Sequence, residues 1–370
     1  MKKANTLIAL VTGFAAIACC NVAKAGNPER TGQSGASELL IDPWAGSSGF
    51  AGANSSCVQG IEAQFLNVAG TAFTNHTEVI VGSTDYLGTQ AGINLSVAGL
   101  CQHVGETGAL GITVTSMNFG NIPITTYDAP EGGLGTYSPQ FINVGISYAR
   151  GFSDNIYGGL NMKLISETVT NVSALGIAID AGIQYVADVA GGKKNLHFGI
   201  SLKNVGPPMK FSGDGLAQDD NLPNGNSGSI TLEQRSQEFE LPALVNIGAA
   251  YDIRVMKDSS GLSQHRITIA ANFTSNSFTL DEEELGVEYG YKSWLSVRVG
   301  FDYEKGIFDA LSTDPVNVGG RLTIFTGPCA GFTLQLPFGK SKASSFGISY
   351  AYRATNPYTG CNTVSIRMNL

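Results

Sequence analysis

Apolar and polar residues alternate with a period of two along much of this chain, the pattern of a β-strand whose two faces meet different surroundings. The stretch 141–149 places Ile142, Val144, Ile146 and Tyr148 on one face. We find about fourteen such segments, and most have about the 9–11 residues that a tilted strand needs to cross an outer membrane. They lie near residues 77–86, 92–103, 108–118, 141–151, 156–167, 175–187, 195–204, 243–255, 265–274, 283–292, 294–304, 316–326, 345–353 and 362–370.

Three features favour a transmembrane β-barrel over a soluble β-sandwich or β-helix, in which strands also alternate. The segments are long and uniform, and Tyr and Phe recur at the ends of their apolar faces, as in an aromatic girdle. The opposite faces carry charges, as a wet or plugged lumen would: Lys163, Asp180, Lys203, Asp252, Glu288, Arg298 and Arg321. The sequence therefore predicts an all-β fold, a transmembrane antiparallel β-barrel of about 14 strands.

The connections between these segments alternate in length, as expected of a barrel with short periplasmic turns and longer external loops. If residue 77 starts on the periplasmic side, the long connections fall outside, at 119–140, 205–242 and 305–315. The short ones then fall inside, at 104–107, 152–155 and 293. One connection disagrees, because 327–344 is long where a periplasmic turn is expected. It is either a periplasmic flap or an error in the strand assignment there.

The first 25 residues have the features of a secretory signal. A basic start precedes an apolar stretch, 7–18, that is too short to span a bilayer as a helix. Small residues at the end of the signal predict cleavage after Ala25. The alternative is a lipoprotein signal that ends at Cys19 or Cys20, although the residues before Cys19 lack the usual Leu. We expect an integral protein of the bacterial outer membrane after signal cleavage.

Residues 26–76 are not strand-like, and a segment of this length could sit in a barrel as a plug or hatch. The barrel then occupies 77–370, with long external loops at 119–140 and 205–242. Glycine supports a filled lumen, because 47 of the 370 residues are Gly and Gly in a strand allows close backbone approach. Nine strand glycines share the polar, inward phase of the alternation: Gly145, Gly176, Gly182, Gly199, Gly248, Gly286, Gly290, Gly300 and Gly347.

The charge of the chain excludes one class of partner. The formal net charge is −8, and removal of the three lysines of the signal makes it −11. Because an acidic protein repels nucleic acid, no nucleic-acid partner is expected. The Gly excess also argues against a coiled coil, and the 43% hydrophobic and 14% charged content argues against disorder.

The signal for catalysis or a cofactor is weak, and we expect neither an enzyme nor a bound metal. The four histidines form no HExxH motif, and the cysteines form no CxxC. Cys57, Cys101, Cys329 and Cys361 are expected to be free buried thiols or to form one structural disulfide. The acidic run 281–284 falls at the end of an external loop, where a solvated loop is favoured over a calcium or lipopolysaccharide-bridging cation site.

Segments between residues 35 and 215 resemble a known family. The Gly/Ala-rich run 45–54, followed by 59–70, resembles the hatch of FadL-like barrels. The hatch residues that carry this resemblance are Glu62, Asn67, Ala69 and Gly70. The match departs at Leu66 and Val68, where Trp and Pro are usual, and at an extra Gln64. More narrowly, the chain resembles the PorV/PorQ family of the type IX secretion system, through residues 38–41, 117–132, 163–167 and 202–207.

The resemblance implies a 14-stranded outer-membrane barrel that acts in type IX protein secretion. Such a protein would bind the C-terminal signal domain of secreted cargo at the outer-membrane translocon and carry it to a surface attachment complex. Membrane lipid and lipopolysaccharide would be further contacts. Loops carry binding function more often than walls do, so the cargo-binding residues are expected in the two long loops: Tyr127, Asp128, Pro130, Glu131, Met209, Phe211 and Asp219.

Two other functions compete with this one. A FadL-like channel for hydrophobic small molecules needs an apolar pocket touched by the plug and a lateral opening, whereas a shuttle needs a sealed lumen and a binding surface at the outer mouth. The third is a barrel enzyme, which would need a nucleophile, a His and a carboxylate to converge.

Overall fold

A computed structural model describes residues 26–189, 194–221, 229–257, 263–310, 321, 323–338 and 344–370. The expected signal, with its cleavage site at Ala25 and the alternative sites at Cys19 and Cys20, lies outside these residues. None of the helices in the described ranges is long and apolar enough to cross a membrane.

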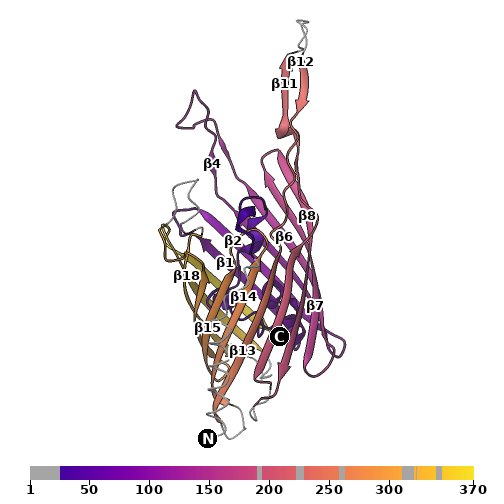
Figure 1. Cartoon of the computed structure of the whole chain (residues 1–370), viewed down its shortest axis with the longest axis vertical. Helices are drawn as coiled ribbons and strands as arrows, with labels where there is room; N and C mark the ends of the chain where they lie inside the picture. The colour runs from indigo at the N-terminus through magenta and orange to yellow at the C-terminus, as the bar shows by residue number, and fades with distance from the viewer. Residues whose placement is uncertain are drawn as a thin grey trace.

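Fourteen long strands form a closed antiparallel ring (Figure 1). Each pairs with the next long strand in the chain, and the ring closes where β1 pairs with β19, with Ile80 opposite Arg367. The predicted fold class, a 14-stranded antiparallel β-barrel, is therefore confirmed. The strands are β1 (Thr77–Tyr86), β2 (Ile93–Val104), β3 (Gly108–Asn118), β6 (Gln140–Gly151), β7 (Ile156–Val169), β8 (Val172–Ala187), β9 (Leu196–Val205), β13 (Leu244–Lys257), β14 (Ser263–Asn276), β15 (Glu282–Tyr291), β16 (Leu295–Glu304), β17 (Phe325–Pro337), β18 (Ser345–Thr355) and β19 (Cys361–Asn369).

The strands point apolar side chains outward and polar or small ones inward, the reverse of a soluble protein. Along β8, Leu175 and Ile183 are 67% and 58% exposed, whereas Asp180 on the other face is 2% exposed. An outward surface of this kind matches the apolar band of an outer-membrane barrel. Six of the seven charged residues that the alternation placed on the inner face are buried, and Arg298 is half-buried. The six are Lys163, Asp180, Lys203, Asp252, Glu288 and Arg321.

The two ends of the barrel differ in the length of their connections. At one end, here called the loop end, the long connections 119–139, 206–243 and 305–324 join the strands. At the other, the turn end, connections such as 105–107 and 292–294 are short. This alternation agrees with the side on which each connection was expected.

One strand lies elsewhere than predicted. A strand was expected at 316–326, but residues 311–320 and 322 lie outside the described part of the chain, and β17 begins at Phe325. The connection at the turn end is therefore 338–344, not 327–344, and the disagreement in loop length disappears. Pro328 and Gly327 make β17 a poor strand by propensity. The ladder accommodates them because the pairing of β17 with β18 shifts register between Phe325 and Cys329.

Two ribbons stand beyond the loop end (Figure 1). In the connection 119–139, β4 (Ile122–Pro123) pairs with β5 (Thr136–Tyr137). In 206–243, β10 (Phe211–Ser212) extends the wall beside β8, η4 (Asp214–Leu216) follows, and β11 (Ala217–Asn221) pairs with β12 (Ser229–Glu233). The β11–β12 hairpin is the part of the described chain that projects furthest in this view (Figure 1).

The N-terminal segment runs through the lumen from the loop end to the turn end. Near its start, Arg30 Nη2 lies 2.6 Å from Glu240 Oε1 in a loop-end connection. Near its finish, the carbonyl oxygen of Thr74 lies 3.1 Å from His103 Nδ1 at the turn end of β2. Its short helices are η1 (Pro28–Arg30), η2 (Ser37–Leu40), α2 (Ala45–Ser48), α3 (Ala63–Leu66) and η3 (Val68–Phe73). We call residues 26–76 the plug.

Wall glycines make room for the plug. A Cβ at Gly182 would lie 2.2 Å from Asn67 Oδ1, and one at Gly286 would lie 2.5 Å from Phe50 Cδ2. Six of the nine glycines in the inward phase lie against the plug in this way: Gly145, Gly182, Gly199, Gly248, Gly286 and Gly300. The other three, Gly176, Gly290 and Gly347, face wall or loop side chains instead.

Candidate functional site

The plug is fixed to the wall by buried polar contacts. Arg367 of β19 lies 2.8 Å from Glu62 of the plug (Nη2–Oε1) and 3.2 Å from Glu78 of β1 (Nε–Oε1). On the opposite side of the lumen, Asn67 donates to the carbonyl oxygen of Ile183 at 3.1 Å. These contacts reach strands far apart around the ring, so the plug is held in one orientation.

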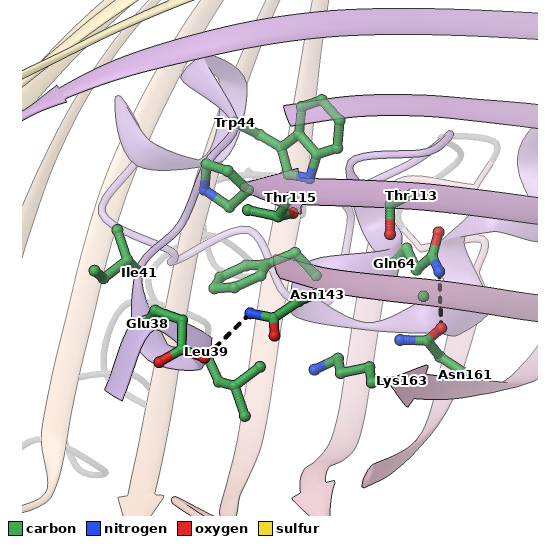
Figure 2. A pocket seen from close by; sticks show the side chains of 13 residues that line it. Glu38, Leu39, Ile41, Trp44, Gln64, Thr113, Thr115, Asn143, Asn161 and Lys163 are labelled. Carbon is green, nitrogen blue, oxygen red and sulfur yellow. Dashed lines mark hydrogen bonds between the residues drawn. The ribbon is translucent and has the colours of Figure 1, made fainter. Parts of the chain in front are cut away.

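Between the plug and strands β3, β6 and β7 the packing leaves only about 50 Å³. Figure 2 shows this small pocket, where Gln64 Nε2 donates to Asn161 Oδ1 at 2.7 Å and Asn143 Nδ2 donates to Glu38 Oε1 at 3.4 Å. Gln64, the extra residue in the hatch box, therefore serves to tie the plug to β7. A space of this size holds a water molecule or two and no substrate.

Larger cavities lie on both sides of the plug, and two of them concern the site. The loop-end cavity has a volume of about 300 Å³ and is lined by plug residues such as Ile41 and Asp42 and by wall residues such as Asp302, Phe325 and Arg353. The turn-end cavity has a volume of about 970 Å³ and lies below the plug. Drug-sized ligands generally occupy pockets of roughly 300–1,000 Å³, so each cavity can admit a small molecule.

Several charges in the turn-end cavity form ion pairs. Glu288 of β15 forms ion pairs with Arg266 of β14 and with Arg298 of β16, the latter at 2.5 Å (Nε–Oε2). Asp252 of β13 lies 2.9 Å from Arg254 Nη2 and 3.7 Å from His197 Nε2. The wall of this cavity thus offers polar groups of both signs.

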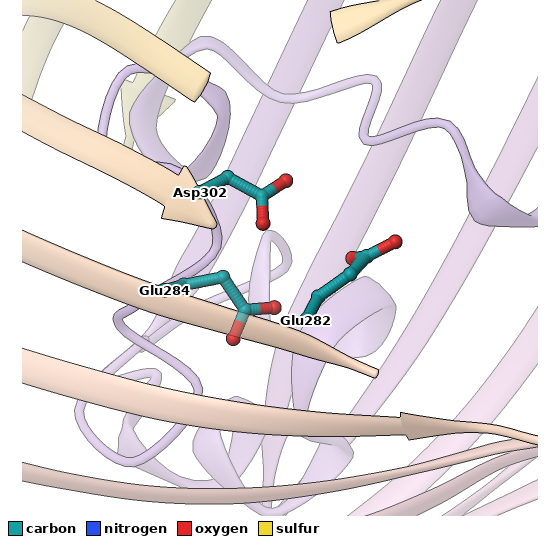
Figure 3. A group of neighbouring side chains, drawn as sticks. All are labelled: Glu282, Glu284 and Asp302. Carbon is teal, nitrogen blue, oxygen red and sulfur yellow. The ribbon is translucent and has the colours of Figure 1, made fainter. Parts of the chain in front are cut away.

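The loop-end cavity is acidic. Glu282 and Glu284 of β15 and Asp302 of β16 bring carboxylate oxygens within 4.8 Å of one another (Figure 3). Arg353 of β18 pairs with Asp302 through Oδ2. The solvated-loop interpretation of the acidic run is wrong for Glu282 and Glu284, because both lie in a barrel strand in the inward phase.

Burial changes the protonation of plug groups that face these cavities. It raises the pKa of Asp42 from the usual 3.8 to about 7, and the nearby Glu62 carboxylate adds to this rise. A hydrogen bond from the backbone N–H of Trp44, at 2.9 Å, acts in the opposite direction. Burial also raises the pKa of the Cys57 thiol, so this cysteine is a poor nucleophile at neutral pH.

The predicted hatch residues all lie inside the barrel. Ala69 and Gly70 belong to η3, and a Cβ at Gly70 would lie 2.1 Å from the carbonyl oxygen of Val58. Leu66 and Val68, which replace the usual Trp and Pro, are buried as well.

The predicted cargo-binding residues separate into two groups. Residues of the β4–β5 loop and the β11–β12 hairpin are exposed: Tyr127, Asp128, Pro130, Glu131 and Asp219. Met209 is 1% exposed and packs with Leu39 and Leu241, and Phe211 is half-buried against the same cluster. Met209 is thus not a surface residue, because the connection folds back at this point and pairs with Phe239.

The four cysteines of the described ranges are free, as the first of the two predicted alternatives has it; Cys101, Cys329 and Cys361 are buried, and Cys57 is half-buried. Sequence reasoning missed Arg353, Asp302, Asp42 and Arg367 as site residues. Their inward phase in a strand, or their place in the plug, was the available signal. Which of these residues come together depends on which strands are neighbours and on the register in which they pair.

Comparison with known proteins gives a likeness of fold. No family model and no curated protein matches the chain. A mutant of the TodX monoaromatic hydrocarbon channel aligns with a TM-score of 0.52 and 11% identity over 88% of this chain and 96% of that one. A Pseudomonas aeruginosa FadL homologue aligns with a TM-score of 0.49 and 12% identity over 87% of this chain and 96% of that one. The Ralstonia pickettii toluene transporter TbuX aligns with a TM-score of 0.46 and 12% identity over 84% of this chain and 92% of that one. The chain therefore has a FadL-like barrel fold, shared with the hydrocarbon channel at 11% identity.

Proposed function

We propose that this chain is an integral outer-membrane channel for small molecules with an apolar body, and not an enzyme. Its place in the membrane is supported by the outward apolar face of the strands and the polar inward face. A closed ring has no exposed sheet edge, which is what a β-structure needs in lipid.

The observation that carries the proposal is the loop-end cavity, which the plug and the wall build together. Leu40 and Ile41 of the plug face Leu244, Ile307 and Phe325 from the barrel side. A molecule in this cavity therefore touches the element that blocks the lumen, so binding there can favour a displaced plug if that state binds it better. The hydrocarbon channel that shares the fold supports an apolar component in the substrate.

Passage past the plug can be tested by tying the plug to the wall. Ser55 Oγ of the plug lies 2.5 Å from Asn272 Oδ1 of β14, which places Ser55→Cys and Asn272→Cys within reach of each other. Cells producing this double variant, with Cys57→Ser to prevent mispairing, should take up radiolabelled toluene only after reduction. Uptake by the unlinked protein no faster than in cells without it would contradict the channel.

The second candidate is the type IX cargo shuttle that the sequence resemblance implies, with the translocon, secreted cargo and surface attachment complex as partners. It is supported by the exposed ribbons beyond the loop end, where Ile230 and Leu232 of β12 are 41% and 48% exposed. Apolar side chains on such a hairpin suit a protein partner.

A short deletion tests the shuttle without damaging the barrel. The backbone N–H of Gln234 donates to the carbonyl oxygen of Leu216 at 2.9 Å, so residues 217–233 can be replaced by a tight turn. The full protein should co-purify with secreted proteins that share a C-terminal domain, and the deletion should lose them. Equal capture by both proteins would rule out the hairpin as the cargo site.

A further inference from the structure

The loop-end cavity is lined by more acidic than basic side chains. Glu282, Asp302 and Glu304 line it from the wall, and Asp42 lines it from the plug. Glu284 lies beside Glu282 and Asp302 in the carboxylate cluster (Figure 3). Arg353 is the basic residue among the lining side chains of this cavity in the described part of the chain.

The register of β15 and β16 places like charges directly opposite each other. Glu282 pairs with Glu304, and Glu284 pairs with Asp302. Like charges at directly opposed positions destabilise a sheet. Nothing in the geometry of two neighbouring strands requires this arrangement, so it needs a compensating interaction.

Nearer the turn end, the same two strands carry opposite charges at paired positions. There Glu288 pairs with Arg298 in the register, and the two side chains form an ion pair. Arg266 on the other neighbouring strand adds a second cation to Glu288. The strand pair is therefore neutralised in the turn-end cavity and left acidic in the loop-end cavity.

Two buried carboxylate oxygens in the loop-end cavity lack a hydrogen-bond partner among the described residues. Asp302 is 8% exposed, and its Oδ1 is unpartnered although Oδ2 binds Arg353. Oδ2 of Asp42, which approaches from the plug, is also unpartnered. Since leaving a buried polar acceptor unsatisfied is costly, the Asp302 oxygen indicates that a donor from outside the chain belongs here, and the Asp42 carboxyl lies beside it in the same cavity.

The remaining lining of the cavity combines apolar or aromatic side chains with uncharged polar ones, mostly Ser and Thr. The apolar and aromatic part includes Leu40, Ile41, Tyr86, Ile307 and Phe325. This combination differs from an all-carboxylate metal cage, because a hydrated ion gains nothing from apolar walls. It suits a molecule with a cationic end and a small hydrophobic body.

We propose that the loop-end cavity binds an organic ammonium ion with a small apolar or aromatic body, which names the substrate class of the channel proposed above and rests on it. Three oxygens no more than 4.8 Å apart have a centre at most about 2.8 Å from each. An N–H⁺···O⁻ bond is about 2.7–2.9 Å long, so an ammonium nitrogen near that centre is within reach of three carboxylates at once. Calcium prefers six to eight oxygen ligands, whereas this cluster brings together three carboxylates.

The test compares three probes of one shape on the purified full-length barrel in detergent. They are 2-phenylethylammonium, the neutral 2-phenylethanol and the anion phenylacetate, each titrated calorimetrically and corrected for uptake by empty micelles. The ammonium should bind at least tenfold more tightly than the alcohol, and the anion should not bind. Glu282→Gln should weaken ammonium binding about tenfold, by one charge-assisted hydrogen bond. Glu283→Gln is the matched control, because this neighbour lies in the opposite, outward phase of β15.

Equal affinity for the ammonium and the alcohol would overturn the charge preference and leave the channel in place. Micromolar binding of CaCl2, together with no binding of the ammonium, would overturn the proposal of an ammonium site in favour of a metal site. An unchanged affinity in both Glu282→Gln and Glu304→Gln would show that the ammonium binds elsewhere. If the barrel bound the ammonium selectively but the unlinked protein took up no toluene, the ammonium site would be supported and the channel function would be contradicted.

Discussion

The guanidinium of Arg367, in the last strand, lies 2.8 Å from the carboxylate of Glu62 in the plug. The same guanidinium lies 3.2 Å from Glu78 in the first strand. One side chain thus links the plug to the seam at which the barrel closes. Without it, two largely buried carboxylates would face each other with no cation between them.

Arg367→Gln is therefore expected to lower the free energy of unfolding by about 2 kcal/mol, because it leaves two buried carboxylates without their cation. Urea titration of the purified barrel measures this. Lys305→Gln, at an exposed loop-end position, should change it by no more than about 0.5 kcal/mol. Adding Glu62→Gln to Arg367→Gln should recover part of the lost free energy of unfolding. If the double variant lost as much as the two single variants together, the Arg367–Glu62 ion pair would be contradicted.

Two inward glycines of β15 offer a matched test of plug packing. A Cβ at Gly286 would lie 2.5 Å from the Phe50 ring, whereas one at Gly290 would lie 3.6 Å from Arg266 Nε, an ordinary contact. Gly286→Ala should destabilise the protein by about 1–3 kcal/mol through overpacking, and Gly290→Ala should be nearly neutral. Limited proteolysis of the plug gives the second readout, since a displaced Phe50 should expose the segment. Equal behaviour of the two variants would mean that the plug is not seated against β15.

The wall could be predicted from the sequence because alternation is a local signal. Segments such as 108–118 and 156–167 needed no knowledge of their neighbours, and 108–118 coincides with β3. β17 was misplaced because Gly327, Pro328 and Pro337 mark turns in most contexts. Here Pro328 is exposed on the outer face beside a register shift, which sequence alone does not reveal.

The site depended on information that no local pattern holds. Glu284 and Asp302 are eighteen positions apart and meet only because β15 and β16 pair in one particular register. Asp42 joins them because the plug passes the loop end of the lumen. Met209 was expected on the surface because it lies in a long external loop, but contacts with Leu39 and Leu241 from distant segments bury it.

Met209 should matter for stability and not for capture of a partner. Its side chain lies against Gly176 and packs in a cluster with plug and loop residues. Met209→Ala is expected to lower the free energy of unfolding by about 2–5 kcal/mol, because it opens a cavity in a well-packed site. Tyr127→Ala, at a fully exposed position, should leave it unchanged. A neutral Met209→Ala would contradict the folded-back path of residues 206–243.

Asp42 makes the stability of the plug depend on pH in a defined direction. Its pKa is raised in the folded protein, from the usual 3.8 to about 7, chiefly by burial. The folded state therefore holds this proton more tightly than the unfolded state does. The resulting stabilisation is fully present below about pH 4 and is lost as pH rises from about 4 through 7.

The variant Asp42→Asn isolates this effect from all other titrating groups. Its amide oxygen can still accept the 2.9 Å hydrogen bond from the Trp44 N–H, and it carries no charge at any pH. The melting temperature of the variant should equal that of the natural protein near pH 4 and exceed it by several degrees at pH 8. Asp128→Asn, on the exposed β4–β5 loop, should show the same small difference at both pH values. An Asp42→Asn difference that does not grow between pH 4 and 8 would mean that the carboxyl is hydrated and ionised in the folded protein. The acidic lining of the loop-end cavity would then carry one more negative charge, and the affinity for an organic ammonium at neutral pH should be correspondingly higher.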